Sequence, residues 1–299
     1  MGAPSIVFQK PCLALEVGTR GEFLSGYYNE IAPVLYELGV PLQTIPVLAK
    51  DTPLQTLRLA QVGARREDLE SLIRPLIPKA EEHFGSLPGR IVIYLSELFD
   101  HYAWASEGEW TMVINPAFPE DFETQFVTQV AHNLSHCARY NRMRDVYKRE
   151  GKFDLFNVEH RRQFRVNLPL AEDVINEGIA AVGSRFIVDK YPALETRATW
   201  YESQISRLLQ EFIGARNVSD QNRILFMNDR SALPPGENWQ LLPKEFVYVG
   251  YYLGWFLVNH ALAEIKLPFK RLLEQSANEI LNLSFSHMQR SQKEENRES

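Results

Sequence analysis

Two histidines in this sequence have the type and spacing needed to bind a metal ion. His132 and His136 lie four residues apart in the segment VAHNLSHCARY. A helix places side chains at this spacing on one face, one turn apart, so both imidazoles can reach the same ion. The spacing alone is weak evidence, because seven histidines in 299 residues give such a pair by chance with odds of roughly one in six. Whether this pair binds a metal therefore has to be judged from the helices and strands expected around it.

The segment that follows Pro119 has the period of an amphipathic helix, and it carries the histidine pair. Acidic residues occupy its first turn, where they favour the positive end of a helix. One apolar stripe recurs at helical spacing through Phe122, Phe126, Val130, Leu134 and Cys137. His132 and His136 point well away from that stripe, so we expect them to form a separate polar face of the helix.

Two short strands are expected before this helix and a second helix after it. Residues 90–95 (RIVIYL) and 110–114 (WTMVI) are β-branched, apolar and bounded by turn residues, which predicts two strands that could pair as neighbours. A later helix, from about Leu170 to Val188, offers several carboxylates. A zincin needs this order: two helical histidines, a downstream carboxylate and a water as the four ligands of zinc, with a strand edge to hold a peptide by main-chain hydrogen bonds.

Three blocks of sequence resemble the YjaZ-like predicted zinc-dependent proteases, a family long classed as a domain of unknown function. VAHNLSHCARY (130–140) is similar to the family's His-Glu-x-x-His helix with its trailing arginine, and EDVINEGIAAVGS (172–184) to its Glu-Gly-Leu-Ala segment. YVGYYLGWFLV (248–258), with LLEQSANEIL behind it, is similar to the Tyr-x-x-Gly-Tyr helix. The resemblance spans roughly residues 88 to 285 and implies a gluzincin-like zinc peptidase. It nominates Glu177 as the third ligand; Glu172 and Asp173 are the alternatives, and Asp173 could instead support a ligand histidine.

The sequence departs from the family pattern at Asn133. The family has a glutamate after the first histidine, where it acts as general base and then as general acid in peptide hydrolysis. An asparagine amide does not titrate near neutral pH. The expected function is therefore that of a metallopeptidase-like zinc protein whose activity is weak or lost. The alternative is a non-catalytic pseudoprotease that binds a peptide or partner protein in a regulatory role, and a third possibility is a metal-free helical interaction protein.

Tyrosines in the third block are further candidates for catalysis. A hydroxyl from Tyr248, Tyr251 or Tyr252 could stabilise the oxyanion that forms when water attacks a peptide carbonyl. Packing is the competing explanation, because Gly250 and Gly254 are spaced four apart in an aromatic-rich helix and favour a close helix contact. His260 is expected to be an ordinary helix histidine with its hydrogen bonds satisfied, and the other histidines, His83, His101, His160 and His287, have no partner at ligand spacing.

The bulk composition excludes several classes of protein. The net charge of −6 and the scattered lysines and arginines argue against a nucleic-acid partner. Two cysteines, Cys12 and Cys137, allow no disulfide framework and favour a reducing compartment, and Cys137 is expected to pack on the apolar stripe. The longest apolar stretch, 246–258, is too short to span a bilayer, and the N-terminus does not have the pattern of a signal peptide.

These features together predict an α+β, mostly helical fold with a small sheet before the histidine helix. The expected organisation is a mainly helical N-terminal region (1–85), a zincin-like domain (86–290) and a solvated, frayed tail (291–299). We expect a cytoplasmic protein with one zinc ion per chain, a peptide or protein as substrate or partner, and no nucleic-acid or membrane partner.

Overall fold

A computed structural model of the chain describes residues 4–8, 66–95, 102–114, 122–149, 157, 159–160, 168–188, 198–216 and 249–298. The chain divides into two compact units, Met1–Asn167 and Leu168–Ser299. Most of the predicted N-terminal helical region, together with Cys12 and Tyr248, lies outside the described residues. Two helices of that region are described, α4 (Arg66–Ile73) and α5 (Leu76–Phe84).

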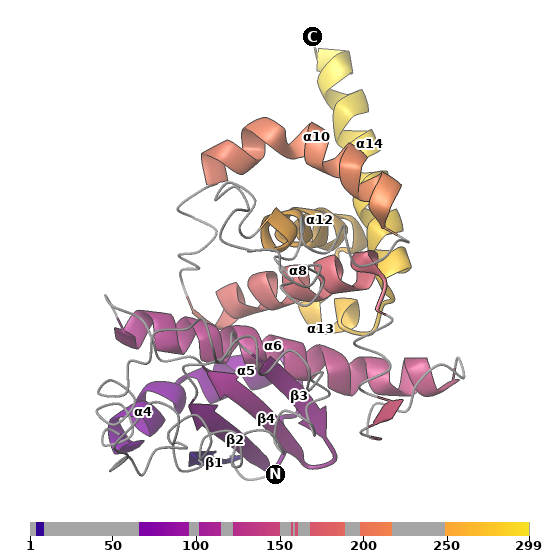
Figure 1. The fold of residues 1–299 in the computed structure, drawn as a ribbon. Coiled ribbons are helices and arrows are strands. Elements are labelled where there is room, and N and C mark those ends of the chain that lie inside the picture. The colour runs from indigo at the N-terminus through magenta and orange to yellow at the C-terminus, as the bar shows by residue number, and fades with distance from the viewer. Residues whose placement is uncertain are drawn as a thin grey trace, which may run out of the picture. The chain divides into compact units, whose positions relative to one another are not determined.

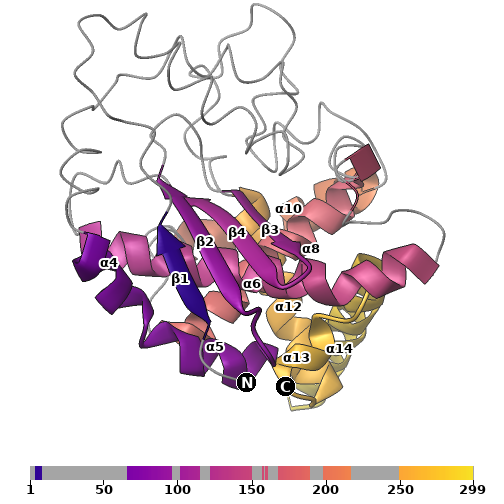
Figure 2. The same ribbon diagram turned by 90° about the horizontal axis from the view of Figure 1, so that it is seen from below.

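The first unit contains a four-stranded mixed sheet with the order β1-β2-β4-β3 (Figure 2). The bounds of its strands are β1 Ser5–Phe8, β2 Arg90–Leu95, β3 Tyr102–Ser106 and β4 Glu109–Ile114. The two predicted strands are β2 and β4, and they do pair as neighbours, in parallel, with Ile91 opposite Trp110. β1 runs parallel to β2, and β3 runs antiparallel to β4 at the edge of the sheet.

The edge strand β3 was not predicted, although Tyr102 and Trp104 in its sequence YAWAS are of residue types that favour strands. It forms because a short turn folds it back onto β4, with Ser106 opposite Glu109. Gly108 in this turn has a φ of 73°, a left-handed conformation that glycine adopts without strain. The hairpin therefore depends on the turn that brings these residues against β4.

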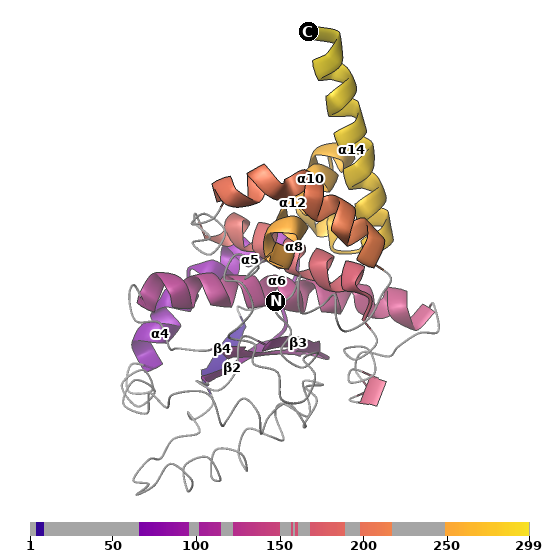
Figure 3. The same ribbon diagram turned by 45° about the horizontal axis from the view of Figure 1, so that its top comes forward.

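Helix α6 (Phe122–Arg149) lies along one face of this sheet and packs against β3 and β4 (Figures 1 and 3). Its predicted apolar stripe is confirmed from Phe126 onward: the described members are all fully buried. Cys137 donates its thiol hydrogen to the main-chain oxygen of Trp104 in β3 at 3.3 Å. The cysteine is thus a packing residue at the interface between helix and sheet, as expected.

The second unit is helical throughout the part that the structure describes. Its long helices are α8 (Leu170–Ile187), α10 (Ala198–Ala215), α12 (Val249–Ile265) and α14 (Ala277–Glu298), with the short α13 (Phe269–Leu272) before α14. Helix α12 is central to this unit, because it packs against α8, α10 and α14 (Figure 1). The approach of α8 and α12 is close: a Cβ added at Gly178 would lie 2.2 Å from the main chain of Gly254.

The prediction of an α+β, mostly helical fold with a small sheet before the histidine helix is confirmed. The predicted helix at about 170–188 is α8, and the apolar stretch expected to be a buried helix is α12 from Val249 onward. Helix α14 continues to Glu298, through the residues for which the sequence predicts a frayed tail. The domain boundaries stay predictions. Among the described helices, none is long and apolar enough to cross a membrane.

Candidate metal centre

The histidine pair lies in the middle of α6, in a stretch that is buried on all sides. Every residue from Thr128 to Arg139 is buried, and His132 and His136 are only 6% and 8% exposed. Their Nε2 atoms are 3.0 Å apart. The rings meet edge to face, with centroids 4.6 Å apart and an interplanar angle of 82°. Helix α6 thus brings the two nitrogens to one point, as their spacing predicts.

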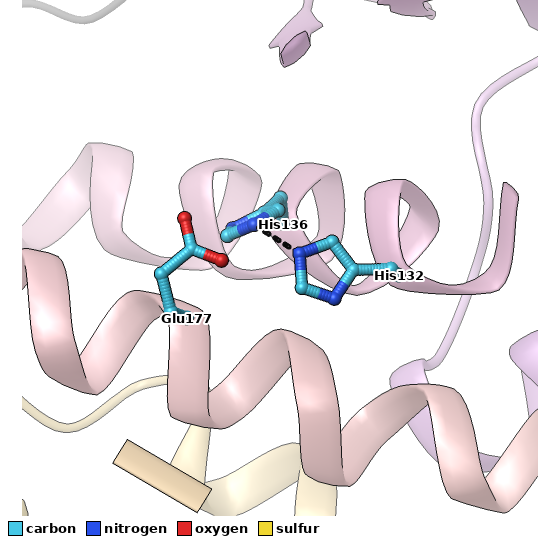
Figure 4. Close-up of side chains that lie close together, drawn as sticks. All are labelled: His132, His136 and Glu177. Carbon is cyan, nitrogen blue, oxygen red and sulfur yellow. Dashed lines mark hydrogen bonds between the residues drawn. The ribbon is translucent and has the colours of Figure 1, made fainter. Parts of the chain in front are cut away.

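Glu177 in α8 completes a group of three potential metal ligands with this pair. One ligand atom from each of the three residues lies within 4.8 Å of the other two (Figure 4). The close-up draws the three side chains, the two histidines on α6 and the glutamate on α8. Two histidine nitrogens and one glutamate oxygen also form the ligand set of one class of catalytic zinc sites.

The other two acids of α8 have different surroundings. Glu172 is buried, and its Oε2 accepts a hydrogen bond at 3.3 Å from the main-chain nitrogen of Ala277, the first residue of α14. A carboxylate at this position satisfies an N–H that the helix itself leaves unpaired. Glu172 therefore has a structural contact within its own unit, while Asp173 is half-buried. Of the three acids proposed from the sequence, Glu177 is the one that lies in the group with the histidines.

Asn133 is even more deeply buried than the histidines that flank it. Its side chain is 1% exposed, and neither its Oδ1 nor its Nδ2 has a hydrogen-bond partner among the described residues. Gln129, one turn earlier in α6, is also buried, and its Oε1 is likewise unpaired there. A buried polar group without a partner costs about 1–3 kcal/mol. The sequence analysis missed Gln129, although its i, i+4 relation to Asn133 in a helix would have revealed it.

The tyrosine candidates are distributed differently. Tyr248 lies outside the described residues, and Tyr251 is half-buried on α12. Tyr252 is 2% exposed and stacks on Tyr201 with ring centroids 4.5 Å apart. Burial, and to a lesser degree the charge of Glu202, raises the pKa of Tyr252 to about 12. Tyr252 is therefore a core residue of the second unit, as the packing explanation expects; a catalytic role for Tyr248 or Tyr251 stays a prediction.

Comparison with known proteins adds no assignment: the sequence matches no family model, no curated protein and no solved structure. The group formed by His132, His136 and Glu177 is accordingly the observation on which a functional conclusion depends.

Proposed function

We propose that this chain is a zinc-binding protein of the zincin metallopeptidase type, with His132, His136 and Glu177 as ligands and with weak or absent peptide hydrolysis. The observation that carries the proposal is the buried histidine pair, whose Nε2 atoms are 3.0 Å apart. Zinc–nitrogen bonds of about 2.0–2.1 Å in a tetrahedral site hold the ligand atoms about 3.3–3.4 Å apart. The pair is within a few tenths of an ångström of that separation, and Glu177 is the acid grouped with it.

The nature of the ligands supports zinc over harder ions. Imidazole nitrogens favour zinc and other transition metals, whereas calcium and magnesium prefer oxygen ligands alone. Zinc held by three protein ligands keeps a fourth position for water and lowers the pKa of that water to about 7. The order of elements, with two parallel strands before the histidine helix and the acidic helix after it, agrees with the resemblance to YjaZ-like proteases.

Asn133 supports the second part of the proposal, which is that hydrolysis is weak or absent. A general base at this position would take a proton from the attacking water and pass it to the leaving amine. The Asn133 amide can accept or donate a hydrogen bond but cannot carry that proton. General acid–base catalysis is typically worth about 10² to 10⁴ in rate, so its loss alone removes most useful activity.

Three buried amide atoms on α6, Oδ1 and Nδ2 of Asn133 and Oε1 of Gln129, have no partner among the described residues. They favour a second candidate function, that of a pseudoprotease which binds an uncleaved peptide. Asn133 offers one acceptor and two donors, and Gln129 adds an acceptor one turn away. A peptide group is complementary to a carboxamide, because it also carries one donor and one acceptor. The edge strand β3, which packs against α6, could add main-chain hydrogen bonds to the same peptide.

The zinc assignment is tested by elemental analysis of protein purified with zinc present. We expect one zinc per chain in the wild type and near zero in His132→Ala and His136→Ala, with weakened retention in Glu177→Ala. His83→Ala on α5 and Glu211→Ala on α10 are matched controls that should keep the metal. Metal content near zero in the wild type, or unchanged in His132→Ala, would overturn the site.

Peptide assays on the zinc-loaded wild type separate the two candidate functions. A diverse peptide library is incubated with the protein, and cleavage products and retained peptides are both measured by mass spectrometry. Slow zinc-dependent cleavage supports a weak peptidase. Retention of intact peptides that is lost in Asn133→Ala, with zinc content unchanged, supports the pseudoprotease.

A further inference from the structure

A second pair of histidines lies in the helical unit, away from α6 in sequence and on different elements. His260 is on α12 and His287 is on α14, 27 residues further along the chain. Their Nδ1 atoms are 2.8 Å apart, and both rings are partly buried. No spacing rule links two residues so far apart; from the sequence, His260 is expected to be an ordinary helix histidine and His287 to have no partner at ligand spacing.

The two rings of this pair face each other head-on. Their centroids are 5.0 Å apart, which is close to the 2.8 Å between the nitrogens plus one ring radius at each end. The His132–His136 rings, by contrast, have centroids 4.6 Å apart although their nitrogens are further apart, at 3.0 Å, so those nitrogens converge on a point beside the pair. An ion in line between His260 and His287 would need about 4 Å, at about 2.0–2.1 Å per zinc–nitrogen bond. The head-on geometry therefore fits one shared proton and not a metal.

We propose that the His260–His287 pair is a pH-sensitive contact between α12 and α14. The contact holds while a single proton lies between the two Nδ1 atoms. When both rings are charged, the contact breaks and the part of α14 around His287 is released from α12. With both rings neutral, one Nδ1–H donates to the other Nδ1. With one added proton, an imidazolium donates to a neutral ring in a stronger, charge-assisted bond. A second added proton places N–H against N–H and charge against charge, so the contact cannot persist.

The surroundings of the pair strengthen this effect. The Phe256 ring packs against the His260 ring with centroids 4.4 Å apart and an interplanar angle of 63°. Burial, and secondarily the charge of His287, lowers the pKa of His260 below its usual value. The folded chain thus resists a proton that the unfolded chain accepts near pH 6.5, so stability is present above that pH and is lost as the pH falls below it.

The charged groups that the structure describes around the pair have other partners or lie elsewhere. Glu264, one turn beyond His260, forms an ion pair with Arg290 of α14, so its charge is already matched. Glu294 is exposed. On the other helices that pack against α12 and α14, Glu172 of α8 contacts Ala277 at the opposite end of α14, and Glu202 of α10 acts on Tyr252, two turns from His260.

The position of the pair along α14 determines which segment would be released. The first half of the helix is held by the contact of Ala277 with Glu172 and by Ser284, whose hydroxyl donates to the main-chain oxygen of Leu257 at 2.6 Å. Past Ser284, the pair and the Arg290–Glu264 ion pair hold the helix, and residues 292–294 are exposed. Loss of the pair should therefore open the segment from about residue 285 onward and leave the start of α14 in place.

Hydrogen exchange between pH 7.5 and 5, with chelator present and corrected for intrinsic rates, tests the proposal. We expect the opening equilibrium of amides in 285–291 to rise by up to about tenfold per pH unit below pH 6.5, while 277–283 change little. In His287→Gln the side chain is neutral at every pH, so the rise should disappear. His83→Gln is the matched control and should keep it. A pH dependence in 285–291 that is the same in wild type and His287→Gln would overturn the proposal.

Nitrogen-15 spectra of the imidazoles in the wild-type protein provide a second test, which does not depend on whether the His287→Gln variant folds. At pH 7.5 we expect opposite tautomers, one ring protonated at Nδ1 and the other at Nε2, because only one proton fits between the two Nδ1 atoms. Identical tautomers of the two rings would contradict a shared proton.

Discussion

Asn133 is the residue whose chemistry separates an active zinc peptidase from a binding protein. It follows His132 directly and is buried, with neither amide atom paired among the described residues. A glutamate at this point would bring a titrating group beside the proposed zinc site; the amide brings hydrogen-bonding capacity alone. Asparagine is one methylene group shorter than glutamate and has a carboxamide in place of the carboxylate, and this difference changes the expected function of the whole site.

Substitution of Asn133→Glu is expected to create or raise zinc-dependent peptidase activity by about 10² to 10⁴, the usual contribution of general acid–base catalysis. Turnover of a diverse peptide library by wild type and variant, each with zinc occupancy confirmed, measures the change. Asn133→Gln has the size of glutamate without its charge and should gain nothing. Robust cleavage by the wild type that survives Asp173→Asn and Glu172→Gln, with no gain in Asn133→Glu, would contradict this description of the site.

Cys137 gives a second prediction at the scale of a residue. Burial raises the pKa of its thiol far above the usual range, and the hydrogen bond to Trp104 only partly opposes that shift. Because the thiolate is the reactive form, the native protein should resist alkylation at Cys137 at pH 8. Site-resolved mass spectrometry after iodoacetamide treatment measures the protection, and the denatured protein, which should react fully, is the control. Rapid labelling of Cys137 in the native state would place this residue outside the core.

The contact of α8 with α12 is the element-scale feature closest to Glu177. Gly178, the next residue, faces Gly254 so closely that a Cβ on either glycine would lie within 3 Å of main-chain atoms of the other helix. Main-chain atoms cannot move aside as a flexible side chain does, so the two glycines fix the distance between the helices. The position of Glu177 within its own unit depends on this packing.

Replacement Gly178→Ala is expected to lower the free energy of unfolding by about 1–3 kcal/mol or more, which is the usual cost of overpacking a core. Gly214→Ala on α10 is the matched control: nothing lies within 4 Å of its added Cβ, and alanine favours a helix over glycine by up to about 1 kcal/mol. Chemical denaturation of both variants measures the difference. Equal stabilities of the two variants would show that α8 and α12 do not pack as closely as described.

For the molecule as a whole, removal of zinc should loosen the structure without unfolding it. Each unit buries an apolar core of its own, which includes Phe126 of α6 in the first unit and Leu253 and Leu257 of α12 in the second. A small zinc finger, by contrast, has no such core and folds only with its metal. Bound zinc at one hundred times its Kd stabilises the folded state by about 2.7 kcal/mol. Chelation should therefore lower the Tm by several degrees, and thermal melts with and without chelator measure it.

The variant His132→Ala is the control for that melt, because a chain without the site should show no shift on chelation. Complete unfolding of the wild type in chelator at room temperature would contradict a metal site carried by self-sufficient units.

The sequence by itself determined the elements with strong local patterns. The period-3.6 stripe from Phe126 to Cys137 specifies α6, the β-branched runs specify β2 and β4, and the i, i+4 spacing of His132 and His136 fixes their common face, since helix geometry is set locally. The resemblance to a protease family pointed to Glu177 ahead of Glu172, and the group within 4.8 Å agrees with it.

Other features were decided by the tertiary structure, because they join residues that are distant in sequence or depend on pairing. β3 exists because a turn returns it to β4, and the first strand, at residues 5–8, pairs with β2 across more than eighty residues. The burial of Asn133, the role of Glu172 at the start of α14, and the meeting of His260 with His287 follow from how helices pack. Local patterns set which face a residue occupies, whereas packing alone sets which residue it meets there.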